Sequence, residues 1–247
     1  WVGMSHLGLR ILYDIANQKE GVWAERAFMP LGDMLALLRE KDLPLFSLEA
    51  KRPLCDFDIL GFSLQYELCA TNVLAMLELG GLPLLASERS EKHPLVIGGG
   101  PLALHPEPLA DFFDLFALGD GEDLLIDLIN AQRRARKHGL SRHETLREMS
   151  QIEGLYIPSL YASNSAGAHI IRRRILPTLD KSPHPASPVI PHIKAVHDRL
   201  GIEVMRGCLH GCRFCQAGYV YRPQRERSPQ DVMQVAETAM GNTGKPL

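Results

Sequence analysis

The stretch Phe113-Asp-Leu-Phe-Ala-Leu-Gly-Asp-Gly-Glu-Asp-Leu-Leu-Ile-Asp-Leu-Ile129 changes its hydrophobic pattern at a glycine-rich turn. Residues 113–118 are a short apolar run of the kind found in buried strands, and Gly119-Asp-Gly-Glu122 follows as a turn. The helix predicted from there to His138-Gly139 has acidic residues early and basic residues late, the order that the helix dipole favours. The stretch therefore predicts a strand, a tight turn and a helix in succession.

The same order recurs on the N-terminal side. Asp58–Leu64 is a compact apolar run, and a helix is predicted over about Glu67–Leu79, before Gly80-Gly81. Pro94–Ile97 then runs into the turn Gly98-Gly-Gly-Pro101. Strands that alternate with helices at this spacing predict an α/β fold with a doubly wound sheet of the Rossmann or flavodoxin type.

The first forty residues predict two helices. One is capped by Ser5, the other covers Asp33–Glu40, and a short strand over Ala24–Met29 separates them. No strand precedes the Ser5 helix, and the chain opens at Trp1. We therefore expect a fragment whose sheet lacks its first strand.

The pattern changes after residue 140. Ser141 and Glu144 have the spacing of a capping box, and strands are predicted at Leu155–Ile157 and Ala168–Ile175. The proline-rich run over 177–191 excludes a helix or an inner strand and indicates an extended connector.

The last segment predicts a strand over Gly201–Met205, a loop with three cysteines, and a helix capped by Ser228. We interpret the chain as an α/β domain over residues 1–139, a connecting segment over 140–200, and a strand–loop–helix unit over 201–247.

Composition excludes several classes of protein. The 247 residues include 27 Lys or Arg and 29 Asp or Glu, and 45% are hydrophobic, which argues against disorder and against a protein that coats nucleic acid through bulk charge. No apolar run is long enough to cross a membrane, and no signal peptide is recognisable. We expect a cytoplasmic protein with no membrane partner.

Three of the five cysteines fall within eight residues: Cys208, Cys212 and Cys215. An odd number of cysteines in a chain without a signal peptide favours metal or redox chemistry over disulfides. Cys55 and Cys69 stand in apolar surroundings and are interpreted as packing residues.

The spacing C-x3-C-x2-C lets three thiolates converge on one soft metal site. A structural zinc ion requires four protein ligands. His210 is a poor candidate for the fourth ligand, because it lies between two of the cysteines and would have to fold back onto the same metal. The spacing favours a [4Fe–4S] cluster with one open iron, and a non-catalytic iron–sulfur or zinc module is the alternative.

Cys208-Leu-His-Gly-Cys-Arg-Phe-Cys215, with an aromatic residue before the third cysteine and a strand before the loop, resembles the signature of radical S-adenosylmethionine enzymes. The longer stretches Gly207–Ser228, Gly3–Gly8 and Gly61–Tyr66 resemble one bacterial subgroup, in which a cobalamin-binding-like domain is fused to the radical enzyme.

The resemblance implies that Cys208, Cys212 and Cys215 bind a [4Fe–4S] cluster whose open iron chelates S-adenosylmethionine, with Phe214 as a cofactor-binding residue. Reductive cleavage would then give a 5′-deoxyadenosyl radical, with a small flavodoxin- or ferredoxin-type protein as electron donor. It also implies that the segment from residue 201 begins a TIM-type barrel. A full barrel needs about 250 residues, so we expect the fragment itself to be inactive. The resemblance does not imply a particular substrate.

The subgroup also implies cobalamin. In the cobalamin-binding fold, a serine and a Gly-Gly pair at strand ends contact the nucleotide tail, and Ser63, Gly98 and Gly99 match them in order and spacing. The chain departs from the D-x-H-x-x-G loop of that fold, because Met4-Ser-His-Leu-Gly8 lacks the aspartate. We therefore interpret His6 as a helix-start residue and not as a cobalt ligand.

Six arginines and two glutamates lie between Arg199 and Arg227. The guanidinium groups could offset an anionic cluster, form a solvated face, or contact RNA phosphates. The last possibility leaves an RNA-base-modifying methyl- or methylthiotransferase as a further alternative, with Arg225 and Arg227 as the phosphate contacts.

Overall fold

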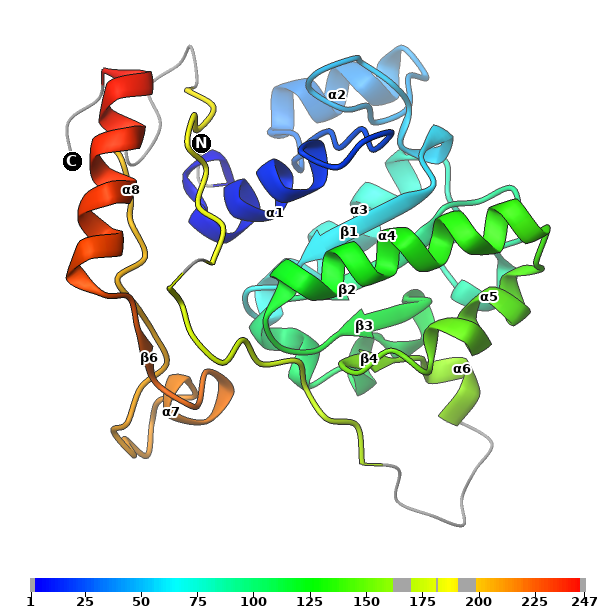
Figure 1. Ribbon diagram of the computed structural model, residues 1–247. Coiled ribbons are helices and arrows are strands. Elements are labelled where there is room, and N and C mark those ends of the chain that lie inside the picture. Colours follow the sequence, from blue (N-terminus) through cyan, green and yellow to red (C-terminus); the bar gives the residue numbers. More distant parts are fainter. Residues whose placement is uncertain (1–2, 162–169, 181, 191–198, 245–247) are drawn as a thin grey trace. The chain divides into compact units, whose positions relative to one another are not determined.

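The computed structural model describes residues 3–161, 170–180, 182–190 and 199–244. The chain divides into two compact units (Figure 1). The sheet unit contains Glu25–Arg174, and the cysteine unit contains Trp1–Ala24 together with Ile175–Leu247. The domain boundaries expected at residues 139 and 200 stay predictions.

The sheet unit is built on four hydrogen-bonded strands, in the order β1-β2-β3-β4. Strands β1, β2 and β3 are parallel, and β4 runs antiparallel to β3. The strands are β1 (Ile59–Ser63), β2 (Leu95–Gly99), β3 (Leu115–Ala117) and β4 (Leu155–Tyr156). This confirms the α/β class and a largely parallel, Rossmann-like sheet.

Helices cover both faces of this sheet, because successive strand residues point to opposite sides. In β2, Val96 packs into one core, whereas Leu95 and Ile97 pack into the other. The first core contains Val73 and Leu77 of α3 (Ala70–Leu79). The second core contains residues of α4 (Gly121–His138) and α5 (Arg142–Met149). Figure 1 shows α3 and α4 on opposite sides of the strands.

The helix ends in the sheet unit follow the expected signals. Gly80 ends α3, and Gly139 ends α4 in the left-handed conformation, with φ of 63°. Ser141 and Glu144 form the predicted capping box at the start of α5. The remaining elements are α2 (Gly32–Glu40), α6 (Pro158–Tyr161) and the 3₁₀ turns Leu54–Asp56, Glu67–Cys69, Ala86–Glu88, Pro101–Leu104 and Glu107–Phe112.

Two predicted strands are not found. The segment Ala24–Met29 is irregular, because the backbone of Arg26 bonds to the loop residues Leu48 and Glu49 instead of a strand. Within the predicted strand Ala168–Ile175, residues 168 and 169 lie outside the described residues. The rest contains one isolated bridge, from Arg174 to Gly119.

The cysteine unit contains short elements. They are a 3₁₀ turn (Gly3–Ser5), α1 (Leu7–Asn17), β5 (Met205–Arg206), α7 (Ala217–Val220), β6 (Arg225–Glu226) and α8 (Pro229–Thr243). His6 caps α1 in place of the predicted Ser5, since its Nδ1 accepts the Leu9 N–H at 3.0 Å. The strand predicted over Gly201–Met205 is reduced to β5, and Ser228 caps α8 as predicted.

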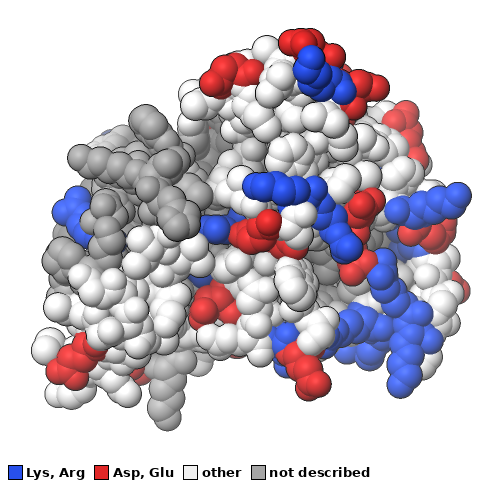
Figure 2. Space-filling model, turned by 90° about the horizontal axis from the view of Figure 1, so that it is seen from above, with Lys and Arg blue, Asp and Glu red and all other residues white. Residues whose placement is uncertain are grey.

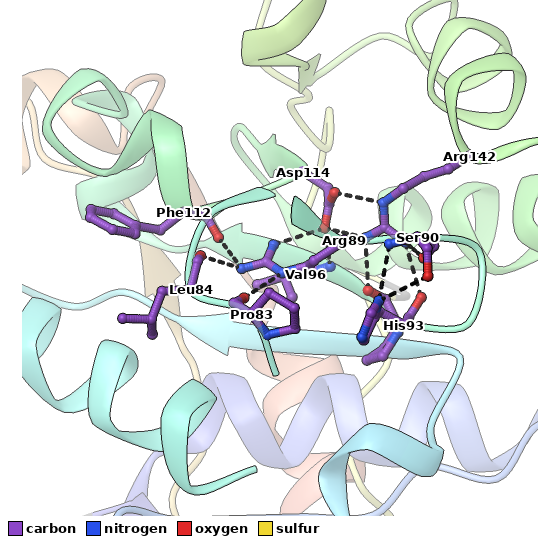
Figure 3. A network of polar contacts seen from close by, with 10 residues as sticks. Pro83, Leu84, Arg89, Ser90, His93, Val96, Phe112, Asp114 and Arg142 are labelled. Atoms are coloured by element: carbon purple, nitrogen blue, oxygen red, sulfur yellow. Dashed lines mark hydrogen bonds and ion pairs between the residues drawn. The ribbon is translucent and has the colours of Figure 1, made fainter. Parts of the chain in front are cut away.

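A buried ion network lies at the amino ends of β2 and β3 (Figure 3). The Asp114 side chain is only 2% exposed, and its Oδ2 accepts hydrogen bonds from Arg89 Nη1 at 3.1 Å and Arg142 Nη2 at 2.7 Å. It also accepts the Val96 N–H at 2.8 Å. Burial lowers the pKa of Arg89, and the Asp114 carboxylate opposes this shift.

The two guanidinium groups also bond to backbone carbonyls. Arg89 donates to Pro83, Leu84 and Phe112, and Arg142 donates to Ser90, His93 and Pro94. The network therefore fixes the loop that leads into β2. Because ligands in open α/β sheets bind at the carboxyl ends of the strands, we interpret the network as structural.

In the part of the chain that the structure describes, no helix is both long enough and apolar enough to cross a membrane. On the face seen in Figure 2, acidic and basic side chains lie interspersed over much of the surface.

Tyr156 gives the sheet unit a testable pH dependence. Burial, helped by the hydrogen bond that its hydroxyl donates to Glu107 Oε1 at 2.9 Å, raises the pKa of Tyr156 to about 12. The unfolded phenol ionises near pH 10, so this contribution to stability is complete below about pH 10 and is lost between about pH 10 and 12.

We expect the free energy of unfolding in urea to fall between about pH 10 and 12 in the unchanged chain, and to fall less in Tyr156→Phe. Tyrosinate absorbance should show one more late-ionising tyrosine in the unchanged chain than in Tyr156→Phe, because burial also raises the pKa of Tyr221. Identical pH dependences of the two proteins would contradict the assignment.

Candidate metal centre

The cysteine loop is closed at its base by a two-stranded ladder. Strands β5 and β6 are antiparallel, with Met205 opposite Glu226 and Arg206 opposite Arg225. Cys208 follows β5 after one residue, so the three cysteines lie between the two strands. The ladder therefore holds together the two ends of the segment that carries the thiols.

Gly207 permits a close backbone approach at the base of the loop. Its φ is 102°, and a Cβ there would lie 2.5 Å from the Tyr221 carbonyl oxygen and 2.7 Å from that of Pro223. Gly218 plays a similar part, since a Cβ there would lie 2.3 Å from the His210 carbonyl oxygen. A side chain at either position would force the backbone apart.

The three thiols differ in exposure. Cys212 is exposed, Cys208 and Cys215 are partly buried, and none of the five cysteines of the chain forms a disulfide. The turn between the last two ligands is held by a hydrogen bond from Cys215 N–H to the Cys212 carbonyl at 3.1 Å. Among the described residues, no three His, Cys, Asp or Glu side chains are gathered as a metal site.

The donor set nevertheless fits an iron–sulfur cluster chemically. Three thiolates on one loop are soft ligands for iron, and they leave one iron of a cubane without a protein ligand. The exposed Cys212 lies in a segment without helix or strand. The assignment of Cys208, Cys212 and Cys215 stays a prediction.

Several residues next to the cysteines in sequence are exposed. Phe214 is 91% exposed and Leu209 is 70% exposed, and His210 is also exposed. The cofactor-binding role expected of Phe214 stays a prediction.

Arg225 and Arg227 are buried, at 8% and 5% exposure, and donate hydrogen bonds to backbone carbonyls within the cysteine unit. The expectation that these two side chains contact RNA phosphates is therefore not supported, because phosphate contacts require accessible guanidinium groups.

At the other candidate site, the sheet register brings Ser63 and Gly99 side by side at the carboxyl ends of β1 and β2. A Cβ built on Gly98 would lie on the opposite face of the sheet, 2.8 Å from the Phe116 ring and 2.9 Å from the Leu64 side chain. Gly98 is thus needed for core packing. The Ser63 hydroxyl accepts a hydrogen bond from Gln65 at 2.7 Å.

These observations do not support cobalamin. Gly98 cannot approach a ligand from within the core, and His6 is the helix cap described above. The roles of Ser63 and Gly99 as ligand contacts stay predictions.

Sequence reasoning missed the residues that support the cysteine loop from a distance. Asp180 Oδ1 accepts the Ser228 N–H at 2.6 Å, and the Ser182 carbonyl accepts from Arg227. Both belong to the segment that we expected to be only a connector. The cap signal at Ser228 was visible, but nothing in the sequence indicates its partner 48 residues earlier.

Comparison with known proteins assigns the chain to a family. The chain is similar to the uncharacterized protein MJ0966 of Methanocaldococcus jannaschii, with 27% identity over 212 residues, which is 84% of this chain and 40% of that protein. The chain thus spans less than half the length of this relative. Residues 8–158 match the family described as radical SAM proteins, N-terminal. Since this match covers more than half of the sequence, the chain belongs to the radical SAM (S-adenosylmethionine) proteins.

Proposed function

We propose that this chain supplies the cluster-binding loop of a radical S-adenosylmethionine enzyme, with Cys208, Cys212 and Cys215 as ligands of a [4Fe–4S] cluster. The observation that carries the proposal is the C-x3-C-x2-C spacing on a loop whose base is closed by β5 and β6, in a chain of this family. When bound, the cluster supplies the electron that cleaves S-adenosylmethionine to a 5′-deoxyadenosyl radical.

The residues of the chain have distinct parts in this proposal. Gly207 and the β5–β6 ladder fix where the loop begins and ends. The three thiolates are the ligands of the cluster. The exposed Phe214 ring is available to pack against the adenine of S-adenosylmethionine. A small flavodoxin- or ferredoxin-type protein is the proposed electron donor.

Anaerobic reconstitution with iron and sulfide tests the proposal. We expect about four iron and four sulfide ions per chain and, after reduction, an EPR spectrum that changes when S-adenosylmethionine is added. The change would show that the ligand reaches the open iron. One zinc ion and no iron would contradict the proposal and favour the zinc module.

The two alternatives are less well supported. A zinc module would need a fourth ligand, and His210 is exposed and lies between two of the cysteines. An RNA-modifying activity would need accessible basic side chains. The two arginines expected to contact phosphates, Arg225 and Arg227, are buried, whereas Arg213 and Arg222 of the same loop are exposed.

A further inference from the structure

Two arginines, one at the start of β6 and one directly after it, are buried in the cysteine unit. Arg225 and Arg227 are buried, whereas Glu226 between them is exposed, as strand alternation requires. Buried guanidinium groups persist only when their donors are satisfied. Their partners therefore show what the two side chains hold together.

Arg227 joins three segments. Its Nε donates to the Glu203 carbonyl at 3.0 Å, just before β5, and its Nη1 donates to the Ser182 carbonyl at 3.3 Å. Its Nη1 also forms an ion pair with Asp231 in the first turn of α8, and its side chain is 1% exposed. One side chain thus ties the start of β5, the segment around Ser182 and α8.

Arg225 adds a second tie. Its Nη1 donates to the Leu176 carbonyl at 2.9 Å, and its Nε donates to the Pro223 carbonyl at 3.1 Å. The Pro223 carbonyl also lies against Gly207, at the residue before Cys208. The guanidinium group therefore contacts the backbone that packs directly on the start of the cysteine loop.

The segment that the two arginines contact is buried in part, whereas Pro177 and Thr178 are exposed. Leu176 is 9% exposed, Leu179 is fully buried and Ser182 is 9% exposed. Asp180 completes the set of contacts, because its carboxylate accepts the N–H of the cap residue Ser228. Residues 176–180 and Ser182, which we name the brace, therefore support the base of the loop and do more than connect two segments.

We propose that Arg225 and Arg227 are positioning residues for the metal centre, which hold the base of the cysteine loop on the brace so that Cys208, Cys212 and Cys215 are presented to one cluster. The inference rests on the proposed function. Supporting residues that orient metal ligands typically change metal affinity about 10–100-fold when mutated, so their loss should be visible in cluster retention.

The test uses the whole chain, reconstituted anaerobically with iron and sulfide, in the unchanged form and as Arg227→Met, Arg227→Lys and Arg225→Lys. Arg199→Met is the matched control, since it removes an exposed guanidinium group from the same unit. The measurements are iron content, the EPR spectrum of the reduced cluster, and the rate at which a chelator removes iron.

We expect a chelator to remove iron from Arg227→Met about tenfold faster than from the unchanged chain, with shifted EPR g values. Arg227→Lys keeps the charge and one donor group and should recover part of this loss. Arg225→Lys keeps a donor for Leu176 but not the second bond to Pro223, and we expect an intermediate rate. Arg199→Met should behave like the unchanged chain.

The outcomes separate the two proposals. If the unchanged chain binds no iron, the proposed function fails. If it binds iron but both Arg227 variants keep the same EPR spectrum and chelation rate, only the positioning role is overturned. If Arg227→Met loses its helical circular dichroism, the test rests on Arg227→Lys and Arg225→Lys. A chelator that removes iron from both at the rate of the unchanged chain would overturn the positioning role.

Discussion

Alanine in place of Cys212 is expected to leave the reconstituted chain with almost no [4Fe–4S] cluster. Cys212 is the exposed thiol between the other two ligands, and two thiolates cannot hold three irons of a cubane. The iron content should fall from about four per chain to a trace, and the EPR signal of the reduced cluster should disappear. Iron and sulfide analysis beside EPR gives the measurement.

Cys55→Ala and Cys69→Ala are the matched controls. Both thiols are partly buried against the first core of the sheet unit, and both variants should bind as much iron as the unchanged chain. Full iron content in Cys212→Ala, or its loss in either control, would contradict the assignment of the ligands.

Asp114→Ala is expected to cause the largest loss of stability in the sheet unit. The substitution leaves the guanidinium groups of Arg89 and Arg142 beside each other, with 0% and 11% of their side chains exposed and no carboxylate between them. Removing one partner of a buried ion pair typically costs about 3–5 kcal/mol. The Val96 N–H also loses its acceptor.

Urea unfolding followed by circular dichroism, with hydrogen exchange at the β2 and β3 amides, measures the effect. Asp111→Ala is the control, because it removes an exposed carboxylate three residues away and should change stability by less than about 0.5 kcal/mol. Asp114→Asn should fall between the two. Equal midpoints for Asp114→Ala and Asp111→Ala would show that the network does not stabilise the fold.

The strands and helices of the sheet unit could be predicted because their signals are local. The apolar runs that became β1, β2 and β3 are bounded by turn residues, and α4 and α5 carry their own cap and charge patterns. The spacing of the three cysteines is equally local, and it predicts a metal-binding loop without any knowledge of the fold.

The predictions that are wrong or unsupported depend on contacts between residues far apart in the sequence. Ala24–Met29 has a strand-like composition, yet the backbone of Arg26 bonds to Leu48 and Glu49, more than twenty residues away. For Arg225 and Arg227 the sequence leaves three roles open, which are to offset a cluster, to form a solvated face or to contact RNA, because sequence does not reveal whether an arginine finds buried carbonyls. Gly98 matched a ligand-contact pattern, but its missing side chain leaves room for Phe116.

The division into units has a practical consequence for dissecting this protein. The chain leaves the cysteine unit after Ala24 and re-enters it at Ile175, so the sheet unit is topologically an insertion with two covalent junctions. The family match over residues 8–158 crosses the first junction and therefore does not mark a separable piece. Excising Glu25–Arg174 and bridging the gap would keep α1 with the cysteine loop. A truncation that starts at Ile175 would discard that helix.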